Sequence, residues 1–419
     1  MKHNSCIDFL KINFYNKRLF WLIVISASGW NMAAIFILIM ARFHTDLTSI
    51  GVTTSYIHWT NTFPSVSICL VKNRITEDFA EFIQERIPGN ETQTAIYRRN
   101  IFDYLFLSPE NMNIKEAYCR GYNSTCGVDI RILRRELLPR SCKNIIKVYY
   151  SDALVPDCET IFKFHELEMG YCFLANNLMD YDNMDLLPLK FSSTKHHPIL
   201  KLVMQGQLIF KYQVYVHSPE DVPYFNAVRF LTTNKITAHT FNIEEMQYNA
   251  DVIEVNVDQR MCKFPSESSN SHFVYSFSSC MSQIRTNMEM KACNCTLFNP
   301  LTDKNDCSMK GIKCLEEADI SERVKQYVGA NLVCLPSCVE QQISHVGSVE
   351  YNGVHDDYIV EIEIASTPSV RFHRSVTQTT LDLIVAIGGV IGLFIGASLL
   401  NILELVSMIL RKLKYLFSN

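Results

Sequence analysis

The sequence of 419 residues is poor in the patterns that mark an enzyme. It contains no Gly-x-Ser-x-Gly turn to present a serine nucleophile and no His-Glu-x-x-His helix to bind a catalytic zinc. Internal repeats, low-complexity tracts and proline-rich linkers are missing too, and the net charge of −4 comes with no block of basic residues. We therefore expect neither an enzyme nor a nucleic-acid-binding protein, and we predict no cofactor and no metal site.

Charged residues are missing from two long segments, one near each end of the chain. The 23 residues from Leu19 to Ala41 carry no charge, and about 20 apolar residues suffice for a helix to cross a bilayer. Residues 383–410 are also apolar and contain a single charge, Glu404. We predict a first membrane helix at 19–41 and a second at 381–410.

A cleaved secretory signal is the alternative for the first segment, because Lys11, Lys17 and Arg18 precede it. The apolar part of such a signal is about 7–15 residues long, which is shorter than this segment. The residues that follow, Arg42-Phe43-His44, also lack the small side chains of a cleavage site. These features favour an uncleaved membrane anchor.

The flanks of the two segments predict the orientation of the chain, since Lys and Arg are enriched on the cytoplasmic side of a membrane. Residues 1–18 carry four basic residues against one acid, and residues 411–419 carry three basic residues and no acid. We therefore place both termini in the cytoplasm and residues 42–380 outside a plasma membrane that the chain crosses twice.

The cysteines agree with this topology. Cys6 stands alone in the N-terminal segment, and the other 14 cysteines all lie between Cys69 and Cys338. An even number of cysteines in an extracellular segment indicates disulfides. The glycosylation sequons of the chain fall in the same segment, at Asn90, Asn123 and Asn294.

Zinc is the alternative for the Cys293-x-Cys295 and Cys334-x3-Cys338 spacings, which resemble those of zinc ligands. An oxidising compartment favours disulfides over zinc. The sequence by itself leaves their pairing open.

The extracellular segment mixes helical and strand periodicity, which indicates one α+β domain. We expect a helix beginning at Thr76-Glu77-Asp78, whose acids suit a helix N-terminus, and a mostly polar helix at Glu316–Leu332. The apolar residues that define these two helices are Phe79, Phe82 and Ile83, and Ile320, Val324, Tyr327 and Val328. Strands are expected at Ile253–Asp258 and Tyr358–Ile364, where apolar and polar residues alternate. The second strand leads through about fifteen residues into the second membrane helix and could carry a signal there.

Small and polar residues are regularly spaced in the second membrane segment. Gly388, Gly392 and Gly396 recur every four residues, so that they form one stripe of a helix where neighbouring backbones approach closely. A helix dimer would explain that much. Polar residues recur every three residues beside the stripe, at Ser398, Asn401 and Glu404. Since an ionisable residue within a membrane usually faces water, the pattern predicts a helix that lines a cation pore.

Five segments of the chain carry recognisable motifs. They are Gly388–Glu404, Phe63–Cys69, Gly170–Phe173, His217–Pro223 and Arg260–Phe264. The first three resemble the second membrane segment, the stretch after the first membrane helix and a Gly-x-Cys-Tyr-x-Phe segment of the degenerin/epithelial sodium channel family. The last two resemble the insect pickpocket branch of that family. The resemblance runs over nearly the whole chain.

This resemblance implies a trimeric, amiloride-sensitive, sodium-selective cation channel with a sensory role, gated by a ligand, another chemical stimulus or force. It implies the finger, thumb and palm fold of acid-sensing channels, with two transmembrane helices and a large disulfide-rich α+β extracellular domain. Three subunits, identical or related, would surround the pore in the lipid bilayer. Sodium would be the permeant ion, and the sequence indicates no particular extracellular ligand.

The resemblance also assigns residues to the pore. The selectivity filter is expected at Gly396, Ala397 and Ser398, where a break in the helix would free backbone carbonyls to replace the hydration shell of the ion. The expected pore-lining residues are Asp382, Gly388, Gly389, Gly392, Asn401 and Glu404.

For the cysteines, the resemblance implies seven disulfides. They are Cys69–Cys172, Cys119–Cys126, Cys142–Cys158, Cys262–Cys338, Cys280–Cys334, Cys293–Cys314 and Cys295–Cys307. Family members often have one further pair, and this chain has Ile284 and Leu332 at its two positions. Since both cysteines are replaced, no thiol is left without a partner.

Two departures from the family pattern bear on activity. Asp8-Phe9 stands about where the family has a cytoplasmic His-Gly gating motif, and Ala386 replaces an acid, for which Asp382 is a partial substitute one turn earlier. Both favour, as an alternative, a nonconducting or auxiliary subunit of the same fold. A trimeric ATP-gated channel shares the two-helix, cysteine-rich layout but would not account for Gly396-Ala397-Ser398.

Overall fold

The structure, a computed structural model, divides the chain into two compact units. Unit 1 consists of residues 1–50, 249–260 and 374–419, and unit 2 of residues 51–248 and 261–373. The residues described are 4–45, 47–55, 58–73, 81, 101–106, 130–192, 198–206, 209–224, 227–268, 274–297, 305–330, 333–352, 356–396, 403–404 and 406–410. The helix expected to begin at Thr76 lies outside them.

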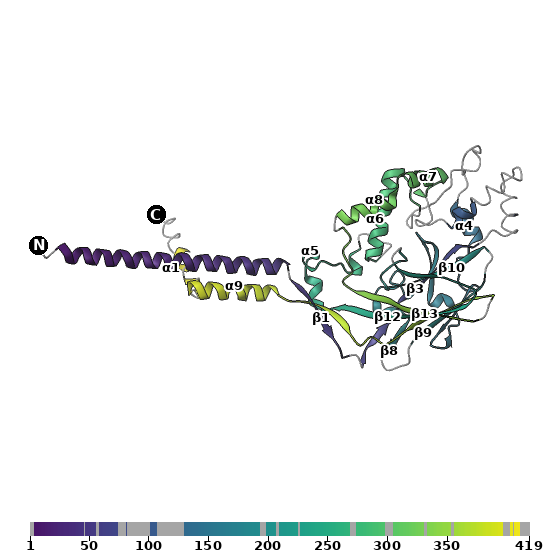
Figure 1. The fold of residues 1–419 in the computed structure, drawn as a ribbon, viewed down its shortest axis with the longest axis horizontal. Helices are drawn as coiled ribbons and strands as arrows, with labels where there is room; N and C mark the ends of the chain where they lie inside the picture. Colours follow the sequence, from purple (N-terminus) through teal and green to yellow (C-terminus); the bar gives the residue numbers. More distant parts are fainter. Residues whose placement is uncertain are drawn as a thin grey trace. The chain divides into compact units, whose positions relative to one another are not determined.

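Two apolar helices make up most of unit 1. Helix α1 spans Asn4–Thr45, and its segment Leu19–His44 is, among the described residues, the one helix long and apolar enough to cross a membrane. Helix α9 spans Thr380–Ile395 and is a shorter apolar helix. The two helices contact each other, as Figure 1 shows. Helix α1 thus contains the predicted span at 19–41, whereas α9 covers about the first half of the span predicted at 381–410.

The strand predicted at Ile253–Asp258 is wrong. These residues, which the contacts assign to unit 1, form the 3₁₀ helix η4 (Ala250–Glu254) and the short helix α5 (Val257–Arg260). The guanidinium group of Arg260 donates to the backbone carbonyls of Ile253 and Val255. Carbonyls that a strand would pair in a sheet are therefore satisfied locally. Val252 is buried but Ile253 is 54% exposed, so the alternation in the sequence did not correspond to the two faces of a sheet.

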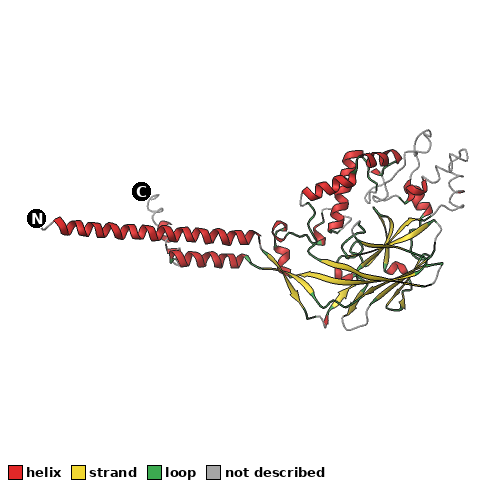
Figure 2. Cartoon of the chain, viewed as in Figure 1, coloured by secondary structure: helices red, strands yellow, loops and turns green. Residues whose placement is uncertain are grey.

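Most strands belong to two large β-sheets, drawn in yellow in Figure 2, and all of their residues lie in unit 2 except 48–50 of β1 and 374–376 of β15. The five-stranded sheet has the order β11-β10-β3-β7-β6, and the eight-stranded sheet has the order β1-β15-β12-β14-β9-β4-β5 with β13 paired to β12. The strands of the first sheet are β3 (Ser65–Lys72), β6 (Phe162–Leu167), β7 (Gly170–Ala175), β10 (Phe210–His217) and β11 (Val228–Leu231). Those of the second are β1 (Thr48–Thr53), β4 (Ile146–Tyr150), β5 (Ala153–Leu154), β9 (Ile199–Met204), β12 (Ile236–Tyr248), β13 (Glu340–Tyr351), β14 (Tyr358–Ile364) and β15 (Arg371–Val376). A small ribbon pairs β2 (Thr60–Thr62) with β8 (Lys190–Ser192).

One hydrophobic core joins the two large sheets. The side chains of Val66 and Phe173 enter it from the five-stranded sheet, and those of Leu202, Phe241 and Ile362 enter it from the eight-stranded sheet. All five are at most 1% exposed. Burying both sheets on one core is the main stabilising contribution expected for such an arrangement.

The strand predicted at Tyr358–Ile364 is confirmed as β14. Alternate side chains along it are buried, and it lies between β12, to which it is parallel, and β9, to which it is antiparallel. As expected, about fifteen residues separate this strand from the second apolar helix, and six of them form β15.

Among the described residues of unit 2, the helices with both ends defined are α4 (Ile130–Leu137), α6 (Phe277–Cys293), α7 (Met309–Glu317) and α8 (Ile320–Ala330), with 3₁₀ turns η2 (Cys158–Thr160), η3 (Met184–Leu186) and η5 (Pro265–Glu267). The single helix expected at Glu316–Leu332 is therefore wrong. The chain turns at Asp319, whose φ is +44°, and this turn lets Leu315 of α7 and Ile320 of α8 pack in one cluster with Met281 of α6. The partly exposed Tyr327 does not belong to that buried face.

Six disulfides cross-link the described part of unit 2. They are Cys69–Cys172, Cys142–Cys158, Cys262–Cys338, Cys280–Cys334, Cys293–Cys314 and Cys295–Cys307. These are the pairs that the family resemblance implies, and the seventh, Cys119–Cys126, lies outside the described residues. Gly311 lets α7 approach one of them closely, since a Cβ atom there would lie 2.5 Å from the sulfur of Cys295.

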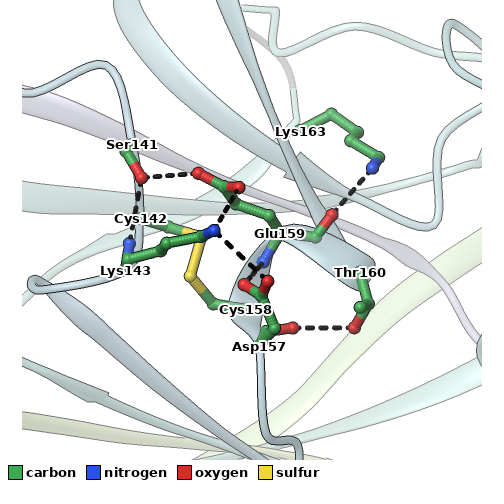
Figure 3. Close-up of a disulfide and its surroundings, with 8 residues drawn as sticks. All are labelled: Ser141, Cys142, Lys143, Asp157, Cys158, Glu159, Thr160 and Lys163. Carbon is green, nitrogen blue, oxygen red and sulfur yellow. Dashed lines mark hydrogen bonds and ion pairs between the residues drawn. A yellow bond between two sulfur atoms is a disulfide. The ribbon is translucent and has the colours of Figure 1, made fainter.

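Polar contacts support the Cys142–Cys158 disulfide, as Figure 3 shows. Asp157 caps η2 by accepting the backbone N–H of Glu159 at 3.0 Å. The ammonium group of Lys143 lies 3.4 Å from the Asp157 carboxylate and 3.1 Å from that of Glu159. The residues on either side of the disulfide are thus held together by side-chain contacts as well as by the covalent bond.

Candidate functional site

Helix α9 begins with a capping box. The hydroxyl of Thr379 accepts the backbone N–H of Asp382 at 3.2 Å, and the Asp382 carboxylate accepts the backbone N–H of Thr379 at 2.9 Å. The Thr379 hydroxyl also donates to that carboxylate at 2.8 Å. This arrangement satisfies two backbone donors that a helix start leaves unpaired. Asp382, which the resemblance assigns to the pore lining, therefore serves at least to fix the start of α9.

The other end of α9 is set by Gly396. Its φ of +66° and ψ of +16° place it in the left-handed region, and its N–H donates to the carbonyl of Gly392 at 3.0 Å. Glycine enters this region without the steric penalty of a side chain. The apolar segment therefore stops being helical at the first residue of the expected selectivity filter.

The left-handed Gly396 interrupts the stripe of small and polar residues that the sequence predicts on one continuous helix. Ser398 and Asn401 were placed beside the glycine stripe on the assumption of a continuous helix, but the helix ends at Ile395. Ala397, Ser398 and Asn401 lie outside the described residues. Glu404 lies in a helical segment and is exposed. Added Cβ atoms at Gly388 and Gly389 would meet nothing within 4 Å, so that this surface of α9 is open in the single chain.

Backbone hydrogen bonds link the end of α1 to the residues before α9. We call residues 47–50, 249–260 and 374–379 the junction; all belong to unit 1. The Thr377 N–H donates to the Leu47 carbonyl at 2.8 Å, and the Asn249 N–H donates to the Arg374 carbonyl at 2.9 Å. The Arg374 guanidinium donates to the Arg260 carbonyl at 3.1 Å. The segment 249–260 is thereby bonded to the chain that enters α9, a link that the sequence argument missed because it assigned a strand there.

A buried ion pair lies at the beginning of β15. The Arg371 guanidinium is 3.0 Å from the Glu245 carboxylate, and both side chains are 9% exposed. The same guanidinium donates to the Thr60 carbonyl and to the Asn61 side chain, each at 2.8 Å, and lies over the ring of Trp59. Burial raises the pKa of Glu245, and the charge of Arg371 opposes that shift. The strand that leads toward α9 is thus fixed to β2 and β12 of unit 2.

The motif at His217–Pro223 is part of the interior of unit 2. Ser67 donates to Nε2 of His217 at 2.7 Å, and Nδ1 of His217 donates to the Ser218 carbonyl at 2.9 Å. The Ser218 hydroxyl donates to Glu220 at 2.6 Å. Burial lowers the pKa of His217 and raises the pKa of Glu220 well above its ordinary value. Buried polar groups that satisfy one another in this way fix the end of β10.

Of the predicted glycosylation sites, Asn294 alone is described. It is exposed and caps the end of α6 with a φ of +54°, whereas Asn90 and Asn123 lie outside the described residues. Among the described residues, no group of three or more His, Cys, Asp and Glu side chains could hold a metal ion.

Comparison with known proteins gives a family for this arrangement. Residues 5–408 match a family model described as amiloride-sensitive sodium channel. Sodium channel protein Nach of Drosophila ananassae is 24% identical over 391 residues, which cover 84% of this chain and 73% of the relative. Pickpocket protein 11 of Drosophila melanogaster is 22% identical over 222 residues, which cover 49% of this chain and 43% of the relative. A solved proton-activated chloride channel is 8% identical, with a TM-score of 0.31 over 93% of this chain and 96% of that chain, and we draw nothing from it.

Proposed function

Because the chain belongs to the amiloride-sensitive sodium channel family, and is similar to insect Nach and pickpocket proteins, we propose that it is a subunit of a sodium channel in the plasma membrane. The family is one of ion channels and not of enzymes. Residues 19–41 and 381–410 serve as the two membrane segments, residues 42–380 lie outside the cell, and residues 1–18 and 411–419 lie in the cytoplasm.

The end of α9 at Gly396 is the observation that supports this proposal most. An irregular backbone within a membrane is tolerated where it lines water or protein. Carbonyls freed by the break at Gly396-Ala397-Ser398 can then take the place of water around a sodium ion. Glu404, below this constriction, favours cations by its charge.

Assembly as a trimer follows from the same proposal. A single α9 exposes apolar side chains such as Leu381, Ile384 and Leu393, and it has open space at Gly388 and Gly389. Small residues allow close packing between helices in a membrane. Three copies, or this chain with related subunits, would bring three breaks together around one pore.

Expression of the chain, alone and with related subunits, tests the proposal. We expect a sodium current that amiloride blocks, and we expect Ser398→Leu to abolish the current or its selectivity while the protein still reaches the cell surface. Unchanged selectivity in Ser398→Leu would refute the assignment of the filter. The stimulus that opens the channel, whether a ligand, another chemical signal or force, is found by applying each to the same cells.

An auxiliary subunit is the second candidate, and two observations favour it. Ala386 provides no carboxylate in α9, and the Asp382 carboxylate one turn earlier is engaged with Thr379. Asp8-Phe9 also departs from the family's cytoplasmic gating motif. If the chain reaches the surface and alters the current of a partner, but Ser398→Leu leaves the selectivity of that current unchanged, the auxiliary role is the correct one.

A further inference from the structure

Two histidines of unit 2 lie side by side where β12 pairs with β13. Nδ1 of His239 is 3.4 Å from Nε2 of His345. Neither side chain takes part in the pore segment, the junction or the buried ion pair. We propose that this pair binds a divalent transition-metal ion of the zinc type, with water molecules completing its coordination.

A β-bulge brings the two histidines onto the same face of the sheet. The register between β12 and β13 shifts between Thr240 and Phe241, so that Thr240 lies opposite Gly347 but Phe241 lies opposite His345. Val346 is the extra residue of the bulge: if the pairing continued from Thr240 and Gly347 without the shift, His345 would lie opposite Asn242 and point to the other face. Bulges of this kind redirect a side chain at a chosen position of a strand.

Aromatic side chains hold the two imidazole rings in place. The His239 ring is stacked on Phe230, with ring centres 3.6 Å apart and planes 16° apart. The ring of Phe241 lies 5.2 Å from that of His345. His239 is buried, whereas His345 is exposed. One ligand is thus fixed in orientation while the other is open to ions from solution.

The distance between the two nitrogens suits a metal ion. Two imidazole nitrogens bound to one tetrahedral zinc at about 2.0–2.1 Å are about 3.3 Å from each other. Metal binding requires neutral imidazoles, whose facing nitrogens have free lone pairs. In the metal-free pair one ring donates its N–H to the other. When the metal binds, that proton moves to the outer nitrogen of the same ring, and both facing nitrogens coordinate the ion. No net proton is released.

The ligand set also limits which ions fit. Imidazole nitrogen suits zinc, copper and nickel, whereas magnesium and calcium require oxygen ligands. With two protein ligands, the ion binds exchangeably and does not serve as a structural ion, because structural zinc sites have four protein ligands.

Residue-resolved chemical labelling tests this proposal in the purified full-length protein. Diethyl pyrocarbonate modifies exposed histidines, and mass spectrometry of the peptides reports each one separately. At a zinc concentration about ten times the dissociation constant, we expect labelling of His345 to slow about tenfold, to recover with a chelator and to be unaffected by magnesium. His58, an exposed histidine outside the pair, is the internal control and should label equally with and without zinc.

Two variants separate the pair from a single ligand. In His239→Gln, protection of His345 from labelling should require at least about ten times more zinc. Loss of a residue that only hydrogen-bonds to a metal ligand already lowers metal affinity about tenfold, and loss of a ligand should cost at least as much. In His345→Gln, which alters an exposed residue, the EPR spectrum of bound Cu²⁺ should lose one nitrogen ligand. Labelling of His345 that is insensitive to zinc, or protection that persists in His239→Gln, would overturn the proposal.

Discussion

Glu289 is a single carboxyl group whose surroundings make unit 2 sensitive to pH. It lies on α6, is 3% exposed and accepts the backbone N–H of Leu297 at 3.0 Å. Burial raises the pKa of Glu289 to about 7, and the hydrogen bond from Leu297 opposes this shift. The carboxyl group therefore changes its charge near neutral pH.

The stability of unit 2 should accordingly fall as the pH rises. The pKa of Glu289 in the folded state lies above its value in the unfolded state, which is about 4.3. The protonated carboxyl group therefore contributes fully to stability below about pH 4.3. This contribution is lost as the pH rises through about 7. Glu289→Gln should remove this dependence and stabilise the protein at pH 8, relative to pH 5, by up to about 3 kcal/mol. Thermal unfolding at both pH values measures the effect. Glu316→Gln, on an exposed part of α7, is the control, and an equal response of both variants would contradict the assignment.

The Glu245–Arg371 pair gives a second prediction for individual residues. Arg371→Met should destabilise the protein by about 3 kcal/mol, because it leaves the Glu245 carboxylate buried without a cation. Removing the cation raises the pKa of Glu245 further, so the loss should be larger at pH 8 than at pH 5. The double variant Arg371→Met with Glu245→Gln should recover much of the stability at pH 8. Unfolding midpoints that are the same in the single and double variants would show that the charge is not the cause.

Secondary-structure elements differ in how well the sequence predicted them, and the difference has a physical basis. The alternation in β14 and the apolar run in α1 were sufficient to predict these two elements. In each case one surrounding determines the pattern, which is a buried sheet face for β14 and an apolar environment along a long helix for α1. The same alternation misled at Ile253–Asp258, where the nearby Arg260 side chain bonds the backbone carbonyls of Ile253 and Val255, an interaction that apolar periodicity does not indicate. At Glu316–Leu332 the turn at Asp319 depends on packing against α6, which periodicity along one helix cannot reveal.

The candidate site was predictable to a similar extent. The family resemblance identified Gly396, and the structure places a left-handed residue there. The capping role of Asp382 could have been predicted, because Thr379 lies three residues earlier, a spacing typical of a capping box. The junction could not be found in the sequence, because it consists of backbone hydrogen bonds between segments more than a hundred residues apart.

The start of helix α9 gives a prediction at the scale of an element. Thr379→Ala removes the cap and should cost about 1 kcal/mol, so the backbone amides of the first turn should exchange hydrogen about fivefold faster. Hydrogen exchange followed by mass spectrometry on the peptide that contains Asp382 measures this. Thr380→Ala, one residue further along, keeps the cap and serves as the matched control. Equal exchange in the two variants would mean that the capping box does not hold the start of α9.

At the scale of the whole molecule, the chain consists of two compact units. Unit 2 has one core between two sheets and, among the described residues, six disulfides. Unit 1 contains both apolar helices and the junction that bonds residues 249–260 to the chain before α9. Residues 249–260 directly follow β12 in the chain, so under the proposed function a change in β12 would reach the start of α9 through covalent and hydrogen bonds.

The central claim is that Gly396 begins the selectivity filter of a sodium pore, and the permeability ratio of sodium to potassium tests it most directly. The measurement compares the wild type with Gly396→Ala and with Gly29→Ala, a control inside helix α1 where an added Cβ meets nothing within 4 Å. Alanine at position 396 would be strained at a φ of +66°. The account predicts that Gly396→Ala loses the current or its sodium selectivity while Gly29→Ala retains both. A Gly396→Ala channel with the wild-type permeability ratio would contradict it.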